Sequence, residues 1–392
     1  MKGFKKKLIP ARVAAIAAAV VLASLTCRGE TAADSVAPLP AAPSATPGTA
    51  PDTARKVSPT LWISQLIGNG FHINDPGVDY PRFPRFLLKV YNWGDRTFNK
   101  YDTAYVVSSG KNWKVQGKSY NWMELQSMIF PKHTYLNMHS DVYIDAGAYI
   151  SFMALSVGYM FNVNELLGRP TSRHTFNLDF TCSRFSGSYT TQSSHGGMVI
   201  TRLGNYNGGH NIHHKYNDVD IKSTSGDLYY FFNHRRYSRA AAYCFSKYQL
   251  RSAGSWIAGL SFARQSIHLD FKNLPPDMLL ALPLQMSVYS FKYNDYTALG
   301  GYGYNWVLRP SRWLLNATGL IALGYKHSFE ESTDGRRDLV ANNFKLSMSG
   351  VYNYKAFFSS LQFRFDGFFY YNSNFTFFNS FTTLSFIVGA RF

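Results

Sequence analysis

The chain has 392 residues, with 40 Lys and Arg against 23 Asp and Glu, and its formal net charge is +17. Nucleic-acid-binding proteins usually gather basic residues into one patch or tail, whereas here no long basic run follows residues 5–7. Aromatic residues make up 17% of the chain, a content typical of barrels with lipid-facing strands and aromatic girdles. The composition therefore argues against a nucleic-acid partner and favours an exported or membrane protein.

Residues 1–27 have the pattern of a secretory signal peptide, since a lysine-rich start precedes an apolar run at 13–26. A membrane-spanning helix needs about 20 apolar residues, which this run does not provide. Cys27 follows the run. The residues before it, Leu25 and Thr26, match a lipoprotein signal poorly because small residues are usual there.

Three segments are expected after the signal peptide. Residues 28–58 are rich in Ala, Pro, Thr, Ser and Asp and predict a disordered linker. Residues 59–110 are expected to be a periplasmic segment or the approach to the first strand, with a short helix or plug at 59–72. Residues 111–392 are expected to form an outer-membrane β-barrel.

The last strand carries the clearest signal for this fold. In 378–392, apolar residues occupy the even positions from 384 to 392, and small or polar residues such as Ser385 and Arg391 occupy most of the odd positions, with Phe381 and Ile387 as exceptions. This alternation predicts a strand with two different faces. A strand that alternates and ends in Phe is typical of the signal that the barrel-assembly machinery recognises. We expect Phe386, Val388 and Phe392 to form that signal.

Three runs before it, at 313–329, 343–352 and 357–371, alternate in the same way. Arg364 and Asp366 share the polar face of the last run and are expected to pair. A charge on the lipid face costs about 2–4 kcal/mol near the midplane, so these residues should face the interior. Large inward residues such as Phe368 and Tyr370 argue against a wide pore.

The fold class is therefore all-β, an up-and-down antiparallel transmembrane barrel of about 12 strands, with 10 to 14 allowed. No segment after residue 27 is a candidate for a transmembrane helix, so a membrane-embedded chain must form a closed barrel. Further strands are expected near 141–161, 175–185, 227–233, 239–249, 254–269 and 294–308. Long exterior loops are expected at 163–174, 186–219 and 270–293.

Several stretches carry a resemblance to a known family, among them "RFLLKVYNWGDRTFNKYDTAYVV", "YIDAGAYISFMALSVGYMFN" and "DLYYFFNHRRYS". Over roughly residues 80–392 the chain resembles a family of uncharacterised Bacteroides-type outer-membrane proteins, known as domain of unknown function 4421. The resemblance implies a barrel and a bacterial outer-membrane location. It implies no activity and no site residues.

Three clusters are candidates for chemistry, each with a simpler alternative. His210, His213 and His214 have a spacing that can bind a transition metal, but solvated loop histidines explain them as well. The turn with His234, Arg235, Arg236 and Arg239 has the charge to hold lipid head groups or lipopolysaccharide phosphates, or is a solvated turn. Ser266, His268 and Asp270 share one face of a strand, as a hydrolase site requires and as any lumen face gives.

The leading hypothesis is a barrel without enzymatic activity that either supports the membrane or passes a small solute, with outer-membrane lipid and lipopolysaccharide as partners. The alternatives are a lipid-modifying hydrolase and a soluble periplasmic protein that binds polyanions. No cofactor is expected, because the Gly-rich stretch 299–306 lacks the Lys and helix of a phosphate loop. Cys182 and Cys244 either pair in an oxidising compartment or stay free.

Overall fold

The computed structural model describes residues 61–70, 72–98, 100–111, 113–130, 134–152, 155–166, 172–282, 287–329, 338–371 and 375–392. The predicted signal peptide, Cys27 and the predicted linker lie outside these residues. Within the described ranges, no helix has the length and apolar character needed to cross a membrane.

Fifteen strands of the described chain form one antiparallel sheet. They are β2 (Trp113–Phe130), β3 (Thr134–Ser140), β4 (Tyr143–Phe152), β5 (Leu155–Asn162), β6 (Ser172–Thr181), β7 (Phe185–His195), β8 (Met198–Leu203), β9 (His214–Tyr216), β10 (Val219–Phe231), β12 (Ala253–Asp270), β13 (Val288–Arg309), β14 (Trp313–Ser328), β15 (Asp338–Tyr354), β16 (Phe357–Tyr371) and β17 (Thr376–Arg391). A separate two-stranded sheet joins β1 (Val106–Ser108) to β11 (Lys247–Gln249).

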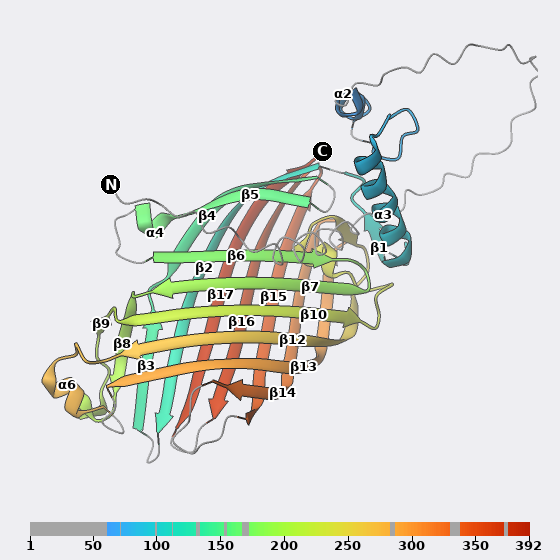
Figure 1. Cartoon of the computed structure of the whole chain (residues 1–392). Helices are drawn as coiled ribbons and strands as arrows, with labels where there is room; N and C mark the ends of the chain where they lie inside the picture. The colour runs from blue at the N-terminus through green and yellow to red at the C-terminus, as the bar shows by residue number, and fades with distance from the viewer. Residues whose placement is uncertain are drawn as a thin grey trace, which may run out of the picture.

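The large sheet closes on itself through β3, β8 and β9, whereas in the described residues no pairing joins β5 to β6. From β10 through β17 each strand pairs with the next, and β17 pairs with β2 along nearly its whole length. On the other side β2 pairs with β3, β3 with β8, and β7, which runs directly into β8, pairs with β10. Figure 1 shows the curl, with β6, β7, β10, β12 and β13 crossing in front of β15, β16 and β17. The predicted transmembrane-type β-barrel is thus confirmed.

The fifteen strands of the described chain occupy twelve strand positions around the barrel, because β3 continues into β4, β7 into β8 and β9 into β10. Two neighbouring strand positions, β3–β4 and β7–β8, separate from each other at a point here called the fork. Below the fork β3 pairs with β8, whereas above it β4 pairs with β5 and β7 pairs with β6. Gly196 and Gly197, with φ of 70° and 73°, allow the chain to bend between β7 and β8. At the same place, the N–H of Asp141 donates a hydrogen bond to the carbonyl of Gly197 at 3.1 Å.

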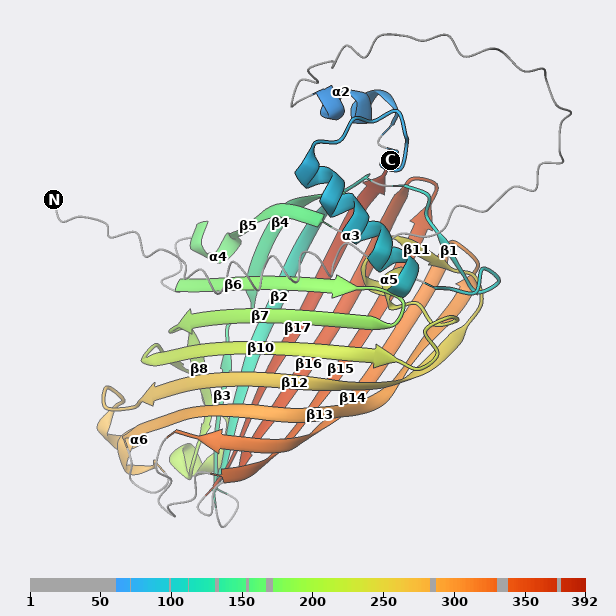
Figure 2. The same cartoon turned by 45° about the vertical axis from the view of Figure 1, so that its right-hand side comes forward.

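The two ends of the barrel differ. The end where β2 begins and β17 finishes, here called the terminal end, has tight turns at 182–184, 310–312 and 355–356. The opposite, or loop, end carries longer connections, including the 3-10 helix η2 (Tyr206–Gly209) and α6 (Pro276–Leu280). The remaining described helices are α2 (Leu61–Gly68), α3 (Arg82–Phe98), α4 (Val163–Leu166) and α5 (Arg239–Tyr243). Figure 2 shows α3 at the terminal end, beside β1 and β11.

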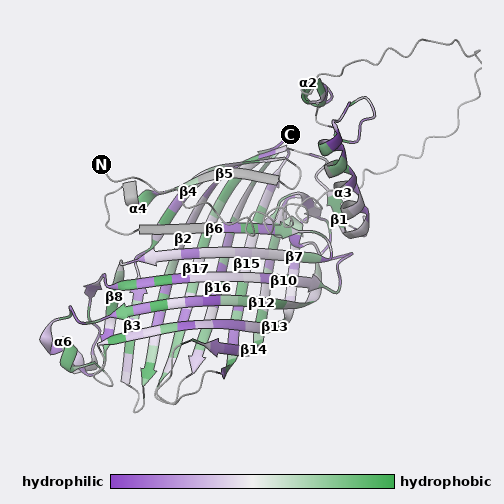
Figure 3. Cartoon of the chain, viewed as in Figure 1, coloured by the Kyte–Doolittle hydropathy of each residue, from purple (hydrophilic) through white to green (hydrophobic). Residues whose placement is uncertain are grey.

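Alternation along the strands separates a greasy outer wall from a polar lumen. On β14, Leu315, Ile321 and Leu323 are exposed on the outer wall, whereas Asn316 and Lys326 are buried inside. The same register holds on β15, β16 and β17, as predicted from the sequence, and the alternation can be followed in Figure 3. An apolar exterior around a polar interior reverses the order in a soluble protein and suits a lipid environment.

The outer wall has the height of a bilayer core. On β13 the outward face from Trp306 to Tyr296 is an apolar run with aromatic rings at both ends, and Leu308 is exposed beyond Trp306. At about 3.3 Å per residue and a tilt near 40°, this run rises about 25 Å. On the neighbouring β14, Trp313 and Tyr325 mark similar limits. These rings correspond to the two aromatic girdles of a membrane barrel.

Two parts of the sequence-based strand assignment are wrong. Residues 239–249, expected to be a strand, form α5 and β11, because Ser238 caps a short Ala-rich helix by accepting a hydrogen bond from the N–H of Ala241 at 3.2 Å. The predicted exterior loop at 186–219 contains β7 and β8. The alternation of apolar and polar residues did not predict strand β7, because its sequence, FSGSYTTQSSH, is polar on both faces.

Candidate functional site

A network of buried charges crosses the lumen at mid-height. The Lys345 ammonium group on β15 lies 2.8 Å from both carboxylate oxygens of Asp227 on β10. Strands β12, β13 and β14 separate these two strands in the sheet, so the pair bridges the lumen between strands that are not neighbours. The side chains of Asp227 and Lys345 are 1% and 7% exposed. Charges removed this far from water need close partners, and here they provide them for each other.

Neighbouring groups complete the coordination of Asp227. The hydroxyls of Ser261 and Ser188 donate to its two oxygens at 2.6 and 3.3 Å. Arg364 on β16 lies 3.5 Å from the same carboxylate and donates to Asp366 at 2.6 Å. The predicted Arg364–Asp366 pair is therefore confirmed and belongs to a larger network that ties β7, β10, β12, β15 and β16 together.

A second buried pair lies along one wall. The Lys326 ammonium group contacts Asp295 at 2.8 Å, with side-chain exposures of 0% and 1%. Asn343 donates to the same carboxylate at 3.1 Å, and Lys326 lies 3.6 Å from the centroid of the Tyr293 ring. Strands β13, β14 and β15 therefore share one compensated charge pair. Such networks fill and cross-link a lumen rather than leave it open.

Apolar side chains seal the lumen below these networks, at the loop end. The rings of Phe291 on β13 and Phe377 on β17 stack with centroids 4.3 Å apart and planes 7° apart. Tyr370 packs edge-on against Phe291, with centroids 5.7 Å apart. Twelve other buried apolar residues from β2, β3, β8, β10, β12 and α6 join this cluster, here called the loop-end seal.

The connection from β10 to β12, residues 232–252, folds into the terminal end as a plug. The side chains of Ala241, Ala242 and Phe245 pack in one apolar cluster with inward residues of β14 to β17. Tyr237 is fully buried, and its hydroxyl accepts a hydrogen bond from Asn316 at 3.1 Å. Strand β11 of the plug also pairs with β1, so the segment before the barrel helps to cover this end.

Arg391, the last residue of β17, fastens the plug to the barrel. Its guanidinium donates to the carbonyl of Phe245 at 2.6 Å, to Asn353 at 2.6 Å and to the Tyr248 hydroxyl at 3.1 Å. Lys114, the second residue of β2, donates a hydrogen bond to the carbonyl of Cys244 at 2.8 Å. The inward position of Arg391 followed from the sequence, but its partner did not, because the plug was mistaken for a strand.

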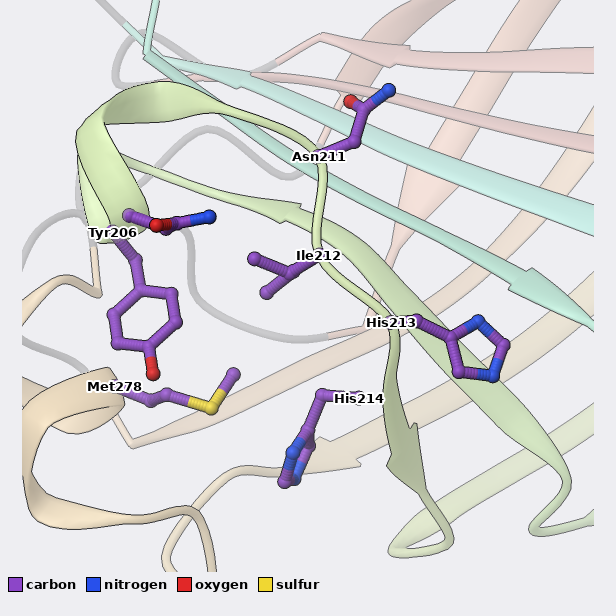
Figure 4. Close-up of a pocket in the computed structure, with 7 residues that line it drawn as sticks. Tyr206, Asn211, Ile212, His213, His214 and Met278 are labelled. Atoms are coloured by element: carbon purple, nitrogen blue, oxygen red, sulfur yellow. The ribbon is translucent and has the colours of Figure 1, made fainter.

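Of the histidines proposed as metal ligands, two line an open pocket of about 520 Å³ at the loop end, whereas His210 directly follows η2 and does not line it. His213 and His214 line it together with Tyr206 and Met278, and Figure 4 shows the two imidazoles pointing in different directions. Within the described part of the chain, no three His, Cys, Asp or Glu side chains converge as a metal site. A hydrogen bond of 3.0 Å from Tyr206 to Asp277 joins η2 to α6 beside the pocket and raises the pKa of the Tyr206 hydroxyl.

The turn proposed to bind anions lies at the terminal end. Arg235 and Arg236 are exposed there, but Arg239 stacks inside over Tyr243, 4.5 Å from the ring centroid. Burial, and next the charge of Arg184, lower the pKa of the His234 imidazole, so that it is neutral near pH 7. Arg235 and Arg236 therefore keep accessible charge at this turn, and Arg236 also lies 3.8 Å from the Asp102 carboxylate.

Ser266, His268 and Asp270 do share one face of β12, but it is the outer wall. Their sequence neighbours Ile267 and Leu269 are fully buried, so the alternative placement of these three residues in the lumen is wrong. Asp270 accepts a hydrogen bond from the N–H of Lys272 at 3.0 Å and does not point to His268 as its orienting acid. The arrangement offers a polar outer rim rather than an assembled nucleophile and base.

The remaining predicted residues have simple placements. Phe386, Val388 and Phe392 all lie exposed along the outer wall at the terminal end, on the last strand. Their recognition by assembly machinery stays a prediction. Cys182 and Cys244 do not form a disulfide with each other in the structure, which excludes the pairing alternative.

No curated protein matches the chain. Among solved structures, the outer membrane protease OmpT from Escherichia coli matches with a TM-score of 0.31 and 8% identity, over 72% of this chain and 97% of OmpT. The translocator domain of the autotransporter NalP from Neisseria meningitidis matches with a TM-score of 0.28 and 10% identity, over 72% and 89%.

The toluene transporter TodX of P. putida matches with a TM-score of 0.23 and 7% identity, over 72% of this chain and 90% of TodX. Likenesses at these TM-scores carry no argument about activity, so the barrel assignment depends on the strand pairing of the chain itself. A family model matches residues 100–392, about three quarters of the sequence. The chain belongs to the family described as "Domain of unknown function (DUF4421)".

Proposed function

We propose that this chain is a bacterial outer-membrane barrel that is closed to solutes and has a structural role in the membrane. The observation that carries the proposal is the filled lumen. Stacked Phe291 and Phe377 occupy the loop end, the Asp227–Lys345 pair spans the middle, and Phe245 of the plug occupies the terminal end. A solute would have to displace all three layers.

The outer wall supports the location. Its apolar band rises about 25 Å between aromatic girdles, which matches the band of outer-membrane barrels. The exposed last strand with Phe386 and Phe392 is the form in which the assembly machinery would meet the chain. The Bacteroides-type origin suggested by the sequence stays a prediction.

Conductance tests the closed state. We expect the full chain, reconstituted in a planar lipid bilayer, to give no current steps above the bare membrane, while a general porin in the same bilayer does. Heat-modifiable migration of the same preparation on a gel would show that a folded barrel was tested. Stable current steps from the folded form would overturn the structural role and favour small-solute passage, the alternative drawn from the sequence.

Fractionation of bacterial membranes tests the proposed outer-membrane location. Expressed with its own N-terminus in a bacterium with two membranes, the chain should sediment with the outer-membrane fraction and resist extraction by carbonate. Recovery as a folded soluble protein from the periplasm would contradict the proposal.

A further inference from the structure

The outer wall at the loop end carries a group of cations in register on three adjacent strands. Lys222 on β10 and Lys292 on β13 lie directly opposite Ser266, which stands between them on β12. Arg264 lies two residues from Ser266 on the same face. All three cationic side chains are exposed, and the residues next to them along each strand are turned into the lumen.

These side chains converge. Directly opposite residues of paired antiparallel strands have Cβ atoms about 5 Å apart, and diagonal neighbours about 7–8 Å. The Arg264 guanidinium lies 5.9 Å from the centroid of the Phe329 ring. Phe329 is next to Lys292, because its N–H donates to the Lys292 carbonyl at 2.8 Å. Arg264 therefore leans toward Lys292, and the Ser266 hydroxyl lies among the cations.

The group lies at the height where lipid head groups begin. One step closer to the midplane, Phe262 and Tyr296 contact each other with ring centroids 5.3 Å apart, and Tyr325 is directly opposite Tyr296. These rings end the outward apolar band, and Arg264 is the first charge beyond them on β12. Because the tight turns lie at the other end, and membrane barrels have short periplasmic turns and longer extracellular loops, this end of the wall meets the outer leaflet.

The aspartates nearest in register have other partners. Asp220 pairs with His195 at 2.8 Å, Asp338 with His327 at 2.9 Å, and Asp270 accepts from the backbone of Lys272 at 3.0 Å. Each of these carboxylates thus contacts a group other than Lys222 or Arg264, whose exposed side chains face the head-group layer.

We propose that Lys222, Arg264, Lys292 and Ser266 bind the phosphate groups of the outer-leaflet glycolipid, lipopolysaccharide. This inference depends on the proposed outer-membrane location. Cations on two strands can approach one phosphate from both sides, with the serine hydroxyl as a further donor. A free anion would be bound poorly here, because the wall is shaped for a bilayer and the glycolipid's acyl chains extend along the apolar band below.

The test compares two triple variants with equal loss of charge. One is Lys222→Gln, Arg264→Gln, Lys292→Gln at the loop end, and the other is Arg309→Gln, Arg312→Gln, Lys355→Gln in exposed turns at the terminal end. Binding of diphosphoryl lipid A to the detergent-solubilised full chain is titrated, with a dephosphorylated lipid A and with inorganic phosphate as further probes. Heat-modifiable migration shows that each variant keeps its barrel.

We expect the loop-end triple to weaken diphosphoryl lipid A binding about 100-fold, since one cation near an anionic lipid surface contributes about fivefold. The terminal-end triple and the wild type should bind alike, and dephosphorylated lipid A should bind weakly to all three. Equal binding by both triples, or equal binding of the two lipids, would overturn the site. Displacement of lipid A by inorganic phosphate at the same concentration would reassign it to a free anion. A barrel that migrates correctly but fails these tests leaves the proposed function intact.

Discussion

Arg391 donates a hydrogen bond from Nε to the carbonyl oxygen of Phe245 at 2.6 Å, which joins the end of the last strand to the tip of the plug. The chain positions are 146 residues apart. The same guanidinium also donates to Asn353 near the end of β15. One side chain thus connects three segments that meet only when the barrel is complete.

Replacing Arg391 should release the plug. In Arg391→Ala, three charge-assisted hydrogen bonds are lost, and hydrogen bonds to charged groups contribute about 1.5–3 kcal/mol each. We expect residues 232–252 to become sensitive to limited proteolysis, measured by mass spectrometry of the fragments, while heat-modifiable migration persists. Arg312→Ala, at an exposed turn, is the matched control. Equal resistance of both variants would show that Arg391 does not hold the plug.

Removing the charge of Asp227 should destabilise the barrel strongly. In Asp227→Asn, the buried Lys345 loses its main counter-ion, and breaking a buried pair from one side costs about 3–5 kcal/mol. Urea unfolding in detergent micelles, followed by tryptophan fluorescence, measures this change. Adding Lys345→Met should recover part of the loss. On the same strand, Asp220→Asn breaks an exposed pair with His195 and should cost about 1 kcal/mol or less.

Opening one end alone should not produce a channel. The variant Phe291→Ala, Phe377→Ala loosens the loop-end seal but leaves the plug, so it should stay silent in planar bilayers. Combined with Arg391→Ala and with the Asp227→Asn, Lys345→Met pair, it should give current steps, because all three layers that fill the lumen are then weakened. Each Phe→Ala change costs about 3–5 kcal/mol, so a folded fraction must be confirmed by heat-modifiable migration. Current from the Phe double variant alone would mean that the plug does not close the lumen.

His234 should titrate below an ordinary histidine, whose pKa is about 6.5. Burial and the charge of Arg184 lower the pKa of this imidazole, so the folded state binds its proton less readily than the unfolded state. The resulting stability is present above pH 6.5 and is lost as the pH falls. Histidine-labelled protein gives the midpoint by NMR, with His234→Gln for assignment. Arg184→Gln should raise the midpoint, and a midpoint at or above 6.5 in the wild type contradicts the placement.

The helices before the barrel should be dispensable for folding. Phe83, Phe86 and Trp93 of α3 are 69%, 57% and 62% exposed, and side-chain hydrogen bonds of this region, such as Asn92 to Asn74 at 2.9 Å, run within it. Deleting residues 61–98 should leave heat-modifiable migration and the urea midpoint unchanged. A fall in the midpoint would show that α2 or α3 supports the barrel.

The sequence predicted best where the two faces of a strand differ in polarity. On β14 to β17 the alternation gave the correct outward and inward residues, including the Arg364–Asp366 pair, because a bilayer tolerates few polar side chains on its side. On β7 both faces are polar and the alternation is absent, so the strand was assigned to a loop. Whether a strand could be predicted therefore depended on the difference in polarity between its two faces, and not on the strand propensity of its residues.

The contents of the lumen were harder to predict. Asp227 lies in a run of Ser, Thr and Gly, and its partner Lys345 is 118 residues away. Such pairings depend on the order of strands around the ring, which alternation does not encode. Phe381 and Ile387 appeared as exceptions to the polar face. They are buried because they pack against Trp122 and against the plug, respectively.

The fork at Gly196 and Gly197 gives the molecule a tapered outline. Because β5 and β6 enter the wall only above the fork, the circumference is smaller at the loop end than at the terminal end, and barrel diameter grows with strand number. A cone of this kind occupies more area in one leaflet than in the other. Crowded copies would then impose curvature on the membrane, with the narrow ends on its concave side.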